Sequence, residues 1–420
     1  MKRETLLTDL YQLTMLQSYW KTGRFNEDCS FDMFFRGFPK DWGYYVLCGV
    51  NEVIDWVTTL EFSMSDIHYL ESTNKFELEF LEYLHKFKFN GNIRAFREGS
   101  IVGAEHPVLT VGGSLGECQF VETGILNIIN FQTLVATKAN RIREIAKKSI
   151  LMEFSARRAQ GQEAALKLSR AAYIGGFNST SNVLAGKEYG IPISGTMAHS
   201  YVMSFETEIE AFVQYYKCYG KYSVFLIDTY DVIQGAKNAV KVFNGDCNCQ
   251  GVRIDSWPSD IVFKEVRDIL DDAGLYNTGI YVSNDMDETK IKSILSKYGD
   301  CIKGFGVGTN LAIGALSGVY KLSSSNYYDK CKFSENKMTY PGSKSVIETN
   351  DGFKVTESNL NNNDMLRIAI YQGVKIKKFD GRNLKQIKND VSNAVKKNIK
   401  TFFCKNLFER YIMVRDQHIK

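Results

Sequence analysis

The sequence predicts an α/β protein whose central element is a parallel barrel. Between Lys138 and Asn310, short β-rich apolar runs alternate with segments of helical period. Seven such alternations require parallel pairing with right-handed crossovers. At this count a closed barrel is favoured over an open doubly wound sheet, although the pattern alone leaves both possible. The expected strands are LMEFS, AYIGGF, IPISGT, YSVFLIDTY, GVRIDS, GIYVSND and IKGFGVGT.

The other elements follow from local pattern in the same way. Strand-like and helical runs also lie on both sides of the barrel, and the chain after Leu322 is rich in Lys, Asn and Ser. We predict an N-terminal α+β domain at 1–130, the barrel at 131–322, and a last segment at 323–420 that returns to the N-terminal domain before a basic helical tail. The expected helices are 6–19, 52–60, 163–171, 183–189, 206–216, 259–273, 384–397 and 401–414, and the expected strands outside the barrel are 30–35, 44–50, a β-rich stretch at 93–121, KVTES and KIKKF.

Composition places the chain among folded, enzyme-sized proteins. Its 420 residues exceed the usual single-core size, and 44% apolar with 24% charged residues is close to the globular average. The longest apolar runs fall far short of the ~20 residues of a membrane span, and the start MKRETLLTDL lacks the apolar region of a signal peptide. We therefore expect a cytoplasmic protein without a membrane partner, whose nine cysteines are reduced thiols.

The charge is concentrated at the C-terminal end. From Arg367 to Lys420 there are 14 Lys/Arg and 4 Asp/Glu, a balance of +10, which leaves −6 for the rest of a chain with net charge +4. Such a tail can contact nucleic acid or an acidic partner, but a solvated helical face is the simpler interpretation. We predict no nucleic-acid partner.

Polar side chains follow successive strands of the predicted barrel. A single acid at such a point is usually a helix N-cap, but several on neighbouring strands converge on one mouth. The sequence therefore predicts an active site at the carboxyl ends of the strands. The residues concerned are Asp228, Arg253, Asp255, Ser256, Ser283, Asn284 and Asp285.

Two further segments offer groups that bind anions. GFGVGTN supplies Gly306, Gly308 and Thr309 at the last strand-to-helix connection, where barrels often bind phosphate, although a plain glycine turn is the alternative. FSARRAQG places Arg157 and Arg158 after the first strand. Arginine forks suit carboxylate or phosphate groups, and a surface arginine pair is the alternative interpretation.

Hydroxyl groups and one histidine complete the candidate mouth. His199 lies in GTMAHS among small residues, where an imidazole can act as a base or as a nucleophile toward phosphorus; a structural histidine is the alternative. GGFNSTSN offers Ser179 and Thr180 at a helix start. Capping explains one hydroxyl of this segment but not a cluster of three, so anion or ribose contacts are the open alternative.

These segments together resemble the nicotinate phosphoribosyltransferase family. The resemblance runs in family order from Leu6 to Lys344 through LTDLYQLTM, FFRGFP, EFSARRAQG, GGFNSTSNVLAG, PISGTMAHS, GVRIDS, VSNDMDE, GVGTNL, GVYKL and KMTYPGSK. It implies an irregular α/β barrel of the type II phosphoribosyltransferase kind, with an N-terminal sandwich domain that C-terminal residues complete, in a homodimer.

The resemblance also implies a reaction and roles for individual residues. Phosphoribosyl passes from phosphoribosyl pyrophosphate to nicotinate with Mg²⁺, and ATP hydrolysis is coupled through a phosphohistidine, which by motif position is His199. Arg157 and Arg253 resemble the substrate-binding arginines. Asp255 and Asp285 are candidates to stabilise the ribose cation and to hold Mg²⁺ on the pyrophosphate. Further implied pocket residues are Gly195, Thr196 and the N-terminal aromatic Tyr11.

Two departures and two alternatives remain. The chain reads DSWPSD where many relatives continue GVRIDS with Gly-Asp, so Trp257 and Pro258 reshape that loop, and residues beyond Glu348 match no family motif.

A nicotinamide-using transferase would present an acid to the amide from the segment GGFNSTSN, which contains none, and Asn182 is the expected occupant of that position. A catalytically silent relative that binds phosphorylated ligands is the other alternative, and the presence of His199 and both arginines argues against it.

Overall fold

The computed structural model describes residues 4–244, 249–256, 262–334, 337–358, 363–377, 379–394 and 399–419. The chain divides into two compact units, one formed by residues 1–134 with 315–420 and the other by residues 135–314. The 25-residue helix α6 (Glu122–Ala146) contains the first boundary. The sequence placed these boundaries at 130/131 and 322/323.

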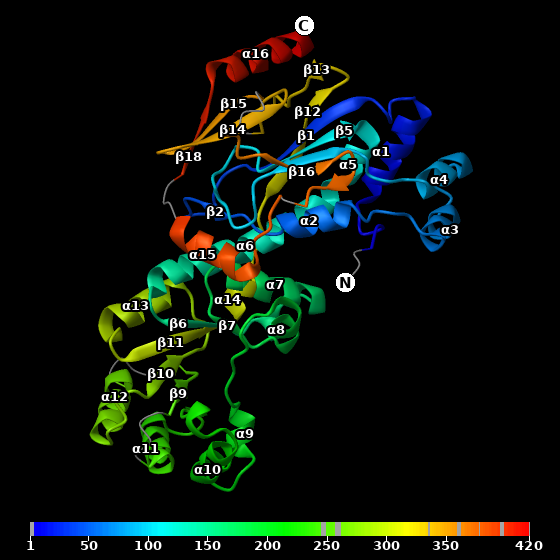
Figure 1. The fold of residues 1–420 in the computed structure, drawn as a ribbon. Helices are drawn as coiled ribbons and strands as arrows, with labels where there is room; N and C mark the ends of the chain where they lie inside the picture. The colour runs from blue at the N-terminus through cyan, green and yellow to red at the C-terminus, as the bar shows by residue number, and fades with distance from the viewer. Residues whose placement is uncertain are drawn as a thin grey trace. The chain divides into compact units, whose positions relative to one another are not determined.

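The unit of residues 135–314 is built on a parallel six-stranded sheet in the order β7-β6-β11-β10-β9-β8. Its strands lie side by side in Figure 1, with α11, α12 and α13 along one side of the sheet. All residues of β9 and β10 are buried, as expected for parallel strands covered on both faces. The strands are β6 (Ile150–Glu153), β7 (Ser179–Thr180), β8 (Val224–Leu226), β9 (Gly251–Ile254), β10 (Gly279–Val282) and β11 (Ile302–Val307).

Helices connect these strands. They are η1 (Ala156–Arg158), α7 (Gln162–Ile174), α8 (Val183–Tyr189), α9 (His199–Met203), α10 (Glu208–Tyr219), η2 (Gly220–Tyr222), α11 (Val232–Phe243), α12 (Val262–Asp272), α13 (Glu288–Tyr298) and α14 (Thr309–Ala312).

Two of the seven expected strands are wrong. AYIGGF is the end of helix α7, which continues to Ile174 and stops where Gly176 takes φ +115°. IPISGT contributes one isolated bridge, between Ile193 and Thr180, rather than a strand. In both segments a short apolar run did not distinguish a strand from a buried helix end or a loop.

The other unit contains an antiparallel seven-stranded sheet in the order β13-β12-β1-β5-β3-β16-β17, a three-stranded sheet β14-β15-β18 and the pair β2-β4. Its strands are β1 (Asp28–Phe35), β2 (Tyr45–Val46), β3 (Asn92–Ala95), β4 (Ile101–Val102), β5 (Leu109–Ser114), β12 (Gly318–Ser325), β13 (Tyr328–Asp329), β14 (Lys344–Thr349), β15 (Gly352–Glu357), β16 (Arg367–Tyr371), β17 (Val374–Lys375) and β18 (Lys400–Phe403). Its helices besides α6 are α1 (Leu10–Lys21), α2 (Val50–Val57), α3 (Met64–Ser72), α4 (Leu78–His85), α5 (Leu115–Phe120), α15 (Leu384–Ala394) and α16 (Lys405–Ile419).

The C-terminal residues complete this unit, since β16 pairs with β3 inside the large sheet and β18 pairs with β15. The expected helix at 401–414 is wrong at its start, because residues 401–403 belong to β18. The expected strand at 44–50 is reduced to β2, and α2 begins at Val50.

The predicted fold class is confirmed in its irregular form: a curled parallel sheet with helices, together with an α+β sandwich unit. The described cysteines are all free thiols. None of the helices in the described ranges combines the length and the apolar character that crossing a bilayer requires.

Candidate active site

A cavity of about 340 Å³ opens at the carboxyl ends of the parallel strands. It gathers six of the residues that the sequence selected, namely Arg157, Gly195, Thr196, His199, Arg253 and Asp255. Phe154, Ala156, Ser181, Met197 and Ala198 complete its lining. The strand-end pattern therefore located a real concave site.

Arg253 is the most firmly held of these residues. It leaves β9 at 9% exposure, and its Nε donates to Ser283 Oγ at 3.1 Å. Its Nη1 donates to Thr196 Oγ1 and to the Met197 carbonyl, and its Nη2 lies 3.0 Å from Asp255 Oδ2. A guanidinium has five N–H donors. These contacts occupy four, so one N–H remains for a ligand.

Asp255 holds this cluster together. Its Oδ1 accepts from Ser283 Oγ, its Oδ2 faces Arg253, and its backbone N–H donates to Asp228 Oδ2 at 2.8 Å. His199 Nε2 lies 3.7 Å from Asp255 Oδ2, and His199 Nδ1 lies 3.2 Å from Thr229 Oγ1. Because both Asp255 oxygens already face protein groups, this carboxylate orients the arginine and the imidazole.

Arg157 contrasts with Arg253. It lies in η1 directly after β6, is exposed, and makes no hydrogen bond or ion pair within the described ranges. Its full fork is therefore available for a carboxylate or phosphate group, which such a fork binds through two parallel hydrogen bonds.

A buried glutamate supports the loops that carry these groups. Glu153, at the end of β6, is 1% exposed and accepts from the Ser155 backbone N–H, from Ser169 Oγ at 2.7 Å and from Thr180 Oγ1 at 2.5 Å. Glu153 thereby connects β7 to the residue that precedes η1, the turn that carries Arg157 and Arg158. Glu153 was not among the predicted site residues, although its charge inside the apolar run LMEFS was a signal that could have revealed it.

Several predicted site residues do not line this cavity. Thr180 is fully buried on Glu153, and Ser179 is buried beside it in β7. Asp285 is exposed after β10, where it and Asn284 adopt positive φ. Tyr11 is exposed on α1 in the other unit.

The glycine segment at the end of β11 has packing roles. A Cβ at Gly306 would lie 2.4 Å from the ring of Phe154, so a side chain there would displace a cavity residue. The Gly308 carbonyl accepts from Ser155 Oγ at 2.9 Å, and Gly308 with Thr309 starts the four-residue helix α14. Neither glycine nor Thr309 lines the cavity.

The side chain of Asn182 stabilises the start of a helix. Its side chain caps helix α8 by accepting from the Ala185 N–H, and its amide faces Ser169 Oγ, while Ser181 lines the cavity. Trp257, Pro258 and Asp260 of the unusual loop lie outside the described residues. Within the described residues, no group of three or more His, Cys, Asp or Glu side chains is arranged to hold a metal ion.

The whole fold is shared with known structures. A crystal structure of human nicotinic acid phosphoribosyltransferase superposes with a TM-score of 0.85 at 24% identity and covers 97% of this chain and 100% of that one. A nicotinate-nucleotide pyrophosphorylase from Pyrococcus furiosus gives 0.77 at 24% identity, covering 93% and 95% of the two chains. These likenesses define the fold class of the chain, an irregular α/β barrel with an α+β sandwich unit.

Sequence comparison identifies the family to which the chain belongs. The model of the nicotinate phosphoribosyltransferase N-terminal domain matches residues 6–130, and that of the nicotinate phosphoribosyltransferase family matches residues 150–316. A nicotinate phosphoribosyltransferase of Bacillus subtilis is 35% identical over 419 residues, covering 96% of this chain and 83% of that protein. One from Mycobacterium tuberculosis is 37% identical over 350 residues, covering 81% and 75%. The chain belongs to the nicotinate phosphoribosyltransferase family.

Proposed function

We propose that this chain joins nicotinate to the ribose 5-phosphate of phosphoribosyl pyrophosphate, which brings nicotinate into NAD biosynthesis. The cluster of Arg253, Asp255 and His199 beside the open fork of Arg157 carries this proposal. The relatives at 35–37% identity, which are named for this activity, support it.

The reaction forms a bond from the pyridine nitrogen to ribose C1 and breaks the bond from C1 to the pyrophosphate oxygen. The lone pair of nicotinate attacks unaided, so the protein needs no base for this step. What it supplies is position and charge. Arg157 clamps an anionic substrate group, Arg253 contributes a fixed positive charge with one free N–H, and Phe154 offers an aromatic wall.

His199 is the group we assign to ATP coupling. When Nδ1–H donates to Thr229 Oγ1, Nε2 keeps its lone pair and faces the cavity beside Asp255. Nε2 then attacks the γ-phosphorus of ATP, the bond to the bridging oxygen breaks, and ADP leaves. Water later hydrolyses the phosphohistidine to inorganic phosphate. Asp255 stabilises the positive charge that the ring carries in between.

A Mg²⁺ ion that enters bound to the substrate phosphates is compatible with this site. Mg²⁺ commonly binds through one or two carboxylates plus substrate phosphates, so a cage of protein ligands is not required. Both Asp255 oxygens already face protein donors, whereas Asp285 is exposed outside the cavity lining and makes no hydrogen bond or ion pair with the described residues. Asp285 is therefore the carboxylate we assign to the ion, which when bound neutralises the pyrophosphate leaving group.

A paired substrate assay tests the proposed function. Purified protein with phosphoribosyl pyrophosphate and Mg²⁺ is offered nicotinate or nicotinamide, each with and without ATP. We expect turnover with nicotinate, stimulated by ATP, because the loop 175–182 presents Ser181 and no carboxylate to the cavity. A preference for nicotinamide would replace the substrate assignment. Absence of turnover with either substrate would favour a silent relative.

We also propose that the protein is a homodimer, as the family resemblance implies. Light scattering of the full chain after size exclusion measures this directly, and a mass near 48 kDa rather than twice that value would contradict it.

A further inference from the structure

Ser283 is a predicted site residue that does not line the active-site cavity. It follows β10 directly and is 3% exposed, so its side chain cannot touch a substrate bound in that cavity. Its hydroxyl nevertheless belongs to the charged cluster, because it contacts both Arg253 and Asp255.

The strand order explains how Ser283 reaches both groups. β9, which carries Arg253 and immediately precedes Asp255, lies between β8 and β10 in the sheet. Ser283 approaches the end of β9 from the β10 side, and its backbone N–H donates to the Ile254 carbonyl at 3.0 Å. Asp228, which follows β8, accepts from the Asp255 backbone N–H on the other side. The end of β9 is therefore held from both neighbouring strands.

A side chain that bridges a guanidinium and a carboxylate must both accept and donate a hydrogen bond. Arg253 Nε donates to Ser283 Oγ at 3.1 Å, and the Ser283 hydroxyl in turn donates to Asp255 Oδ1. The space is also limited, since a Cβ at Gly306 of β11 would lie 3.3 Å from the Ser283 Cβ. A serine hydroxyl is small and combines both hydrogen-bonding roles.

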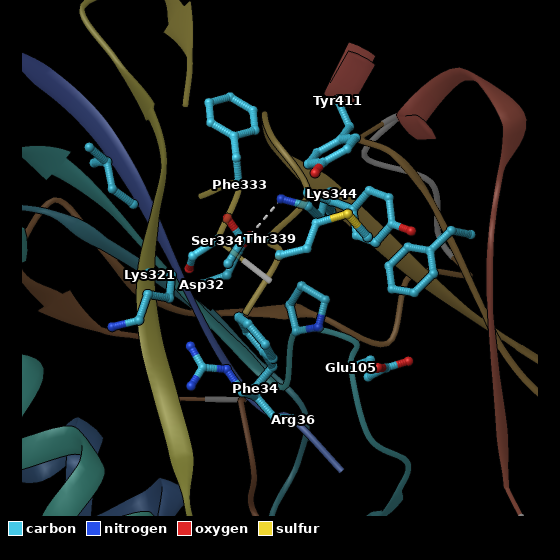
Figure 2. A pocket seen from close by; sticks show the side chains of 15 residues that line it. Asp32, Phe34, Arg36, Glu105, Lys321, Phe333, Ser334, Thr339, Lys344 and Tyr411 are labelled. Carbon is cyan, nitrogen blue, oxygen red and sulfur yellow. Dashed lines mark hydrogen bonds and ion pairs between the residues drawn. The ribbon is translucent and has the colours of Figure 1, made fainter. Parts of the chain in front are cut away.

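A buried ion pair does not by itself require such a bridge. In the other unit, Asp32 is 4% exposed and its Oδ2 accepts directly from Lys344 Nζ at 2.7 Å, as Figure 2 shows. The Asp32 Oδ1 is buried and accepts no hydrogen bond from any described residue. The Ser283 bridge is therefore an addition to the ion pair between Arg253 and Asp255.

The bridge restricts the orientation of the guanidinium. Thr196, Met197 and Asp255 bind three of the four N–H groups on Nη1 and Nη2. Ser283 binds the N–H of Nε. If Nε were released, the guanidinium could turn about its remaining contacts, and its free N–H would no longer keep one direction in the cavity.

We propose that Ser283 is a positioning residue, whose hydroxyl directs the free N–H of Arg253 toward the substrate and holds the Asp255 carboxylate in place. This inference rests on the proposed phosphoribosyl transfer, in which Arg253 supplies a fixed positive charge. Ser283 itself makes no contact with the substrate.

A matched pair of variants tests the role of the hydroxyl. S283T and S283V have nearly the same size and differ in the hydroxyl group, so any steric cost is common to both. We expect kcat/KM for transfer to nicotinate to be at least about tenfold lower in S283V than in S283T, because a charge-assisted hydrogen bond is lost. S296A, which removes an exposed hydroxyl of α13, should match the wild type. Equal rates for S283T and S283V would overturn the proposal.

A double-mutant cycle shows whether Ser283 acts through Arg253. If it does, adding S283V to R253A should lower the rate by less than about twofold, because the charge that the hydroxyl orients is already absent. If the two losses multiplied in the double variant, Ser283 would act independently of Arg253, and the proposal would be overturned.

The Arg253 Nε–H resonance tests the same hydrogen bond without turnover. In ¹H–¹⁵N spectra of the full chain this signal is assigned by its loss in R253K. We expect it to shift in S283V and to stay close to the wild-type position in S283T, and an unchanged position in S283V would overturn the proposal. If the wild type used no nicotinate, the proposed function would fail, and the spectra would still show whether Ser283 holds Arg253.

Discussion

Replacing Glu153 tests whether this buried carboxylate holds the segments beside the active-site cavity in place. In E153Q the amide oxygen can still accept from the Ser155 N–H. The amide NH₂ can donate to Ser169 Oγ, whose hydroxyl can then turn to the Ala165 carbonyl at 3.0 Å. Only the charge assistance of three buried bonds is lost, so we expect a cost of about 1–2 kcal/mol in the free energy of unfolding. In E153A all three bonds and the packing are lost, and we expect about 3–5 kcal/mol.

Urea unfolding of the full chain measures both variants against E163Q, an exposed glutamate of α7 that should change stability by less than about 0.5 kcal/mol. Because Ser155 precedes the turn that carries Arg157, E153Q should also raise KM for nicotinate more than it lowers kcat. Stability and KM values equal to those of E163Q would refute the supporting role of Glu153.

Three other perturbations have defined outcomes. H199N should abolish acid-labile ³²P incorporation from γ-labelled ATP, and labelling that survives in this variant would move the phosphoryl acceptor elsewhere. R157K should raise KM for nicotinate at least about tenfold because a lysine lacks the planar fork, whereas R158K should stay within about twofold, and equal effects would reject the clamp. Burial lowers the pKa of His106 to about 4 from its ordinary 6.5, so the folded state binds fewer protons than the unfolded state between these values. The stability present above pH 6.5 should therefore fall by about 3 kcal/mol as pH drops to 4; this slope should vanish in H106Q and persist in H68Q, and an identical pH profile for wild type and H106Q would contradict it.

The parallel strands and the mouth were predictable because local chemistry decides them. YSVFL, GVRI and GIYV are apolar and β-rich, and strands of this kind in a parallel sheet direct the residues that follow them to one edge. Arg253 and Asp255 follow from that rule, and His199 from its place among small residues. These residues line one cavity with Arg157.

What the sequence could not reveal depends on contacts between distant segments. Gly306 is needed because the ring of Phe154 packs against it, and Asn182 turns toward Ser169 because α8 needs an N-cap. The run AYIGGF has the residues of a strand, but in the folded chain it ends a helix. Local pattern contains no information on such partners.

Phosphorus NMR of the purified full chain with phosphoribosyl pyrophosphate tests the central claim most directly. If the barrel mouth transfers phosphoribosyl to nicotinate, the two pyrophosphoryl resonances of the donor should give way to free pyrophosphate and one nucleotide monophosphate signal only after nicotinate is added. In R253A this conversion should slow at least about a hundredfold, because the fixed charge of the cluster is lost. Unchanged donor resonances in the wild type, or an equal rate in R253A, would contradict the assignment of this mouth.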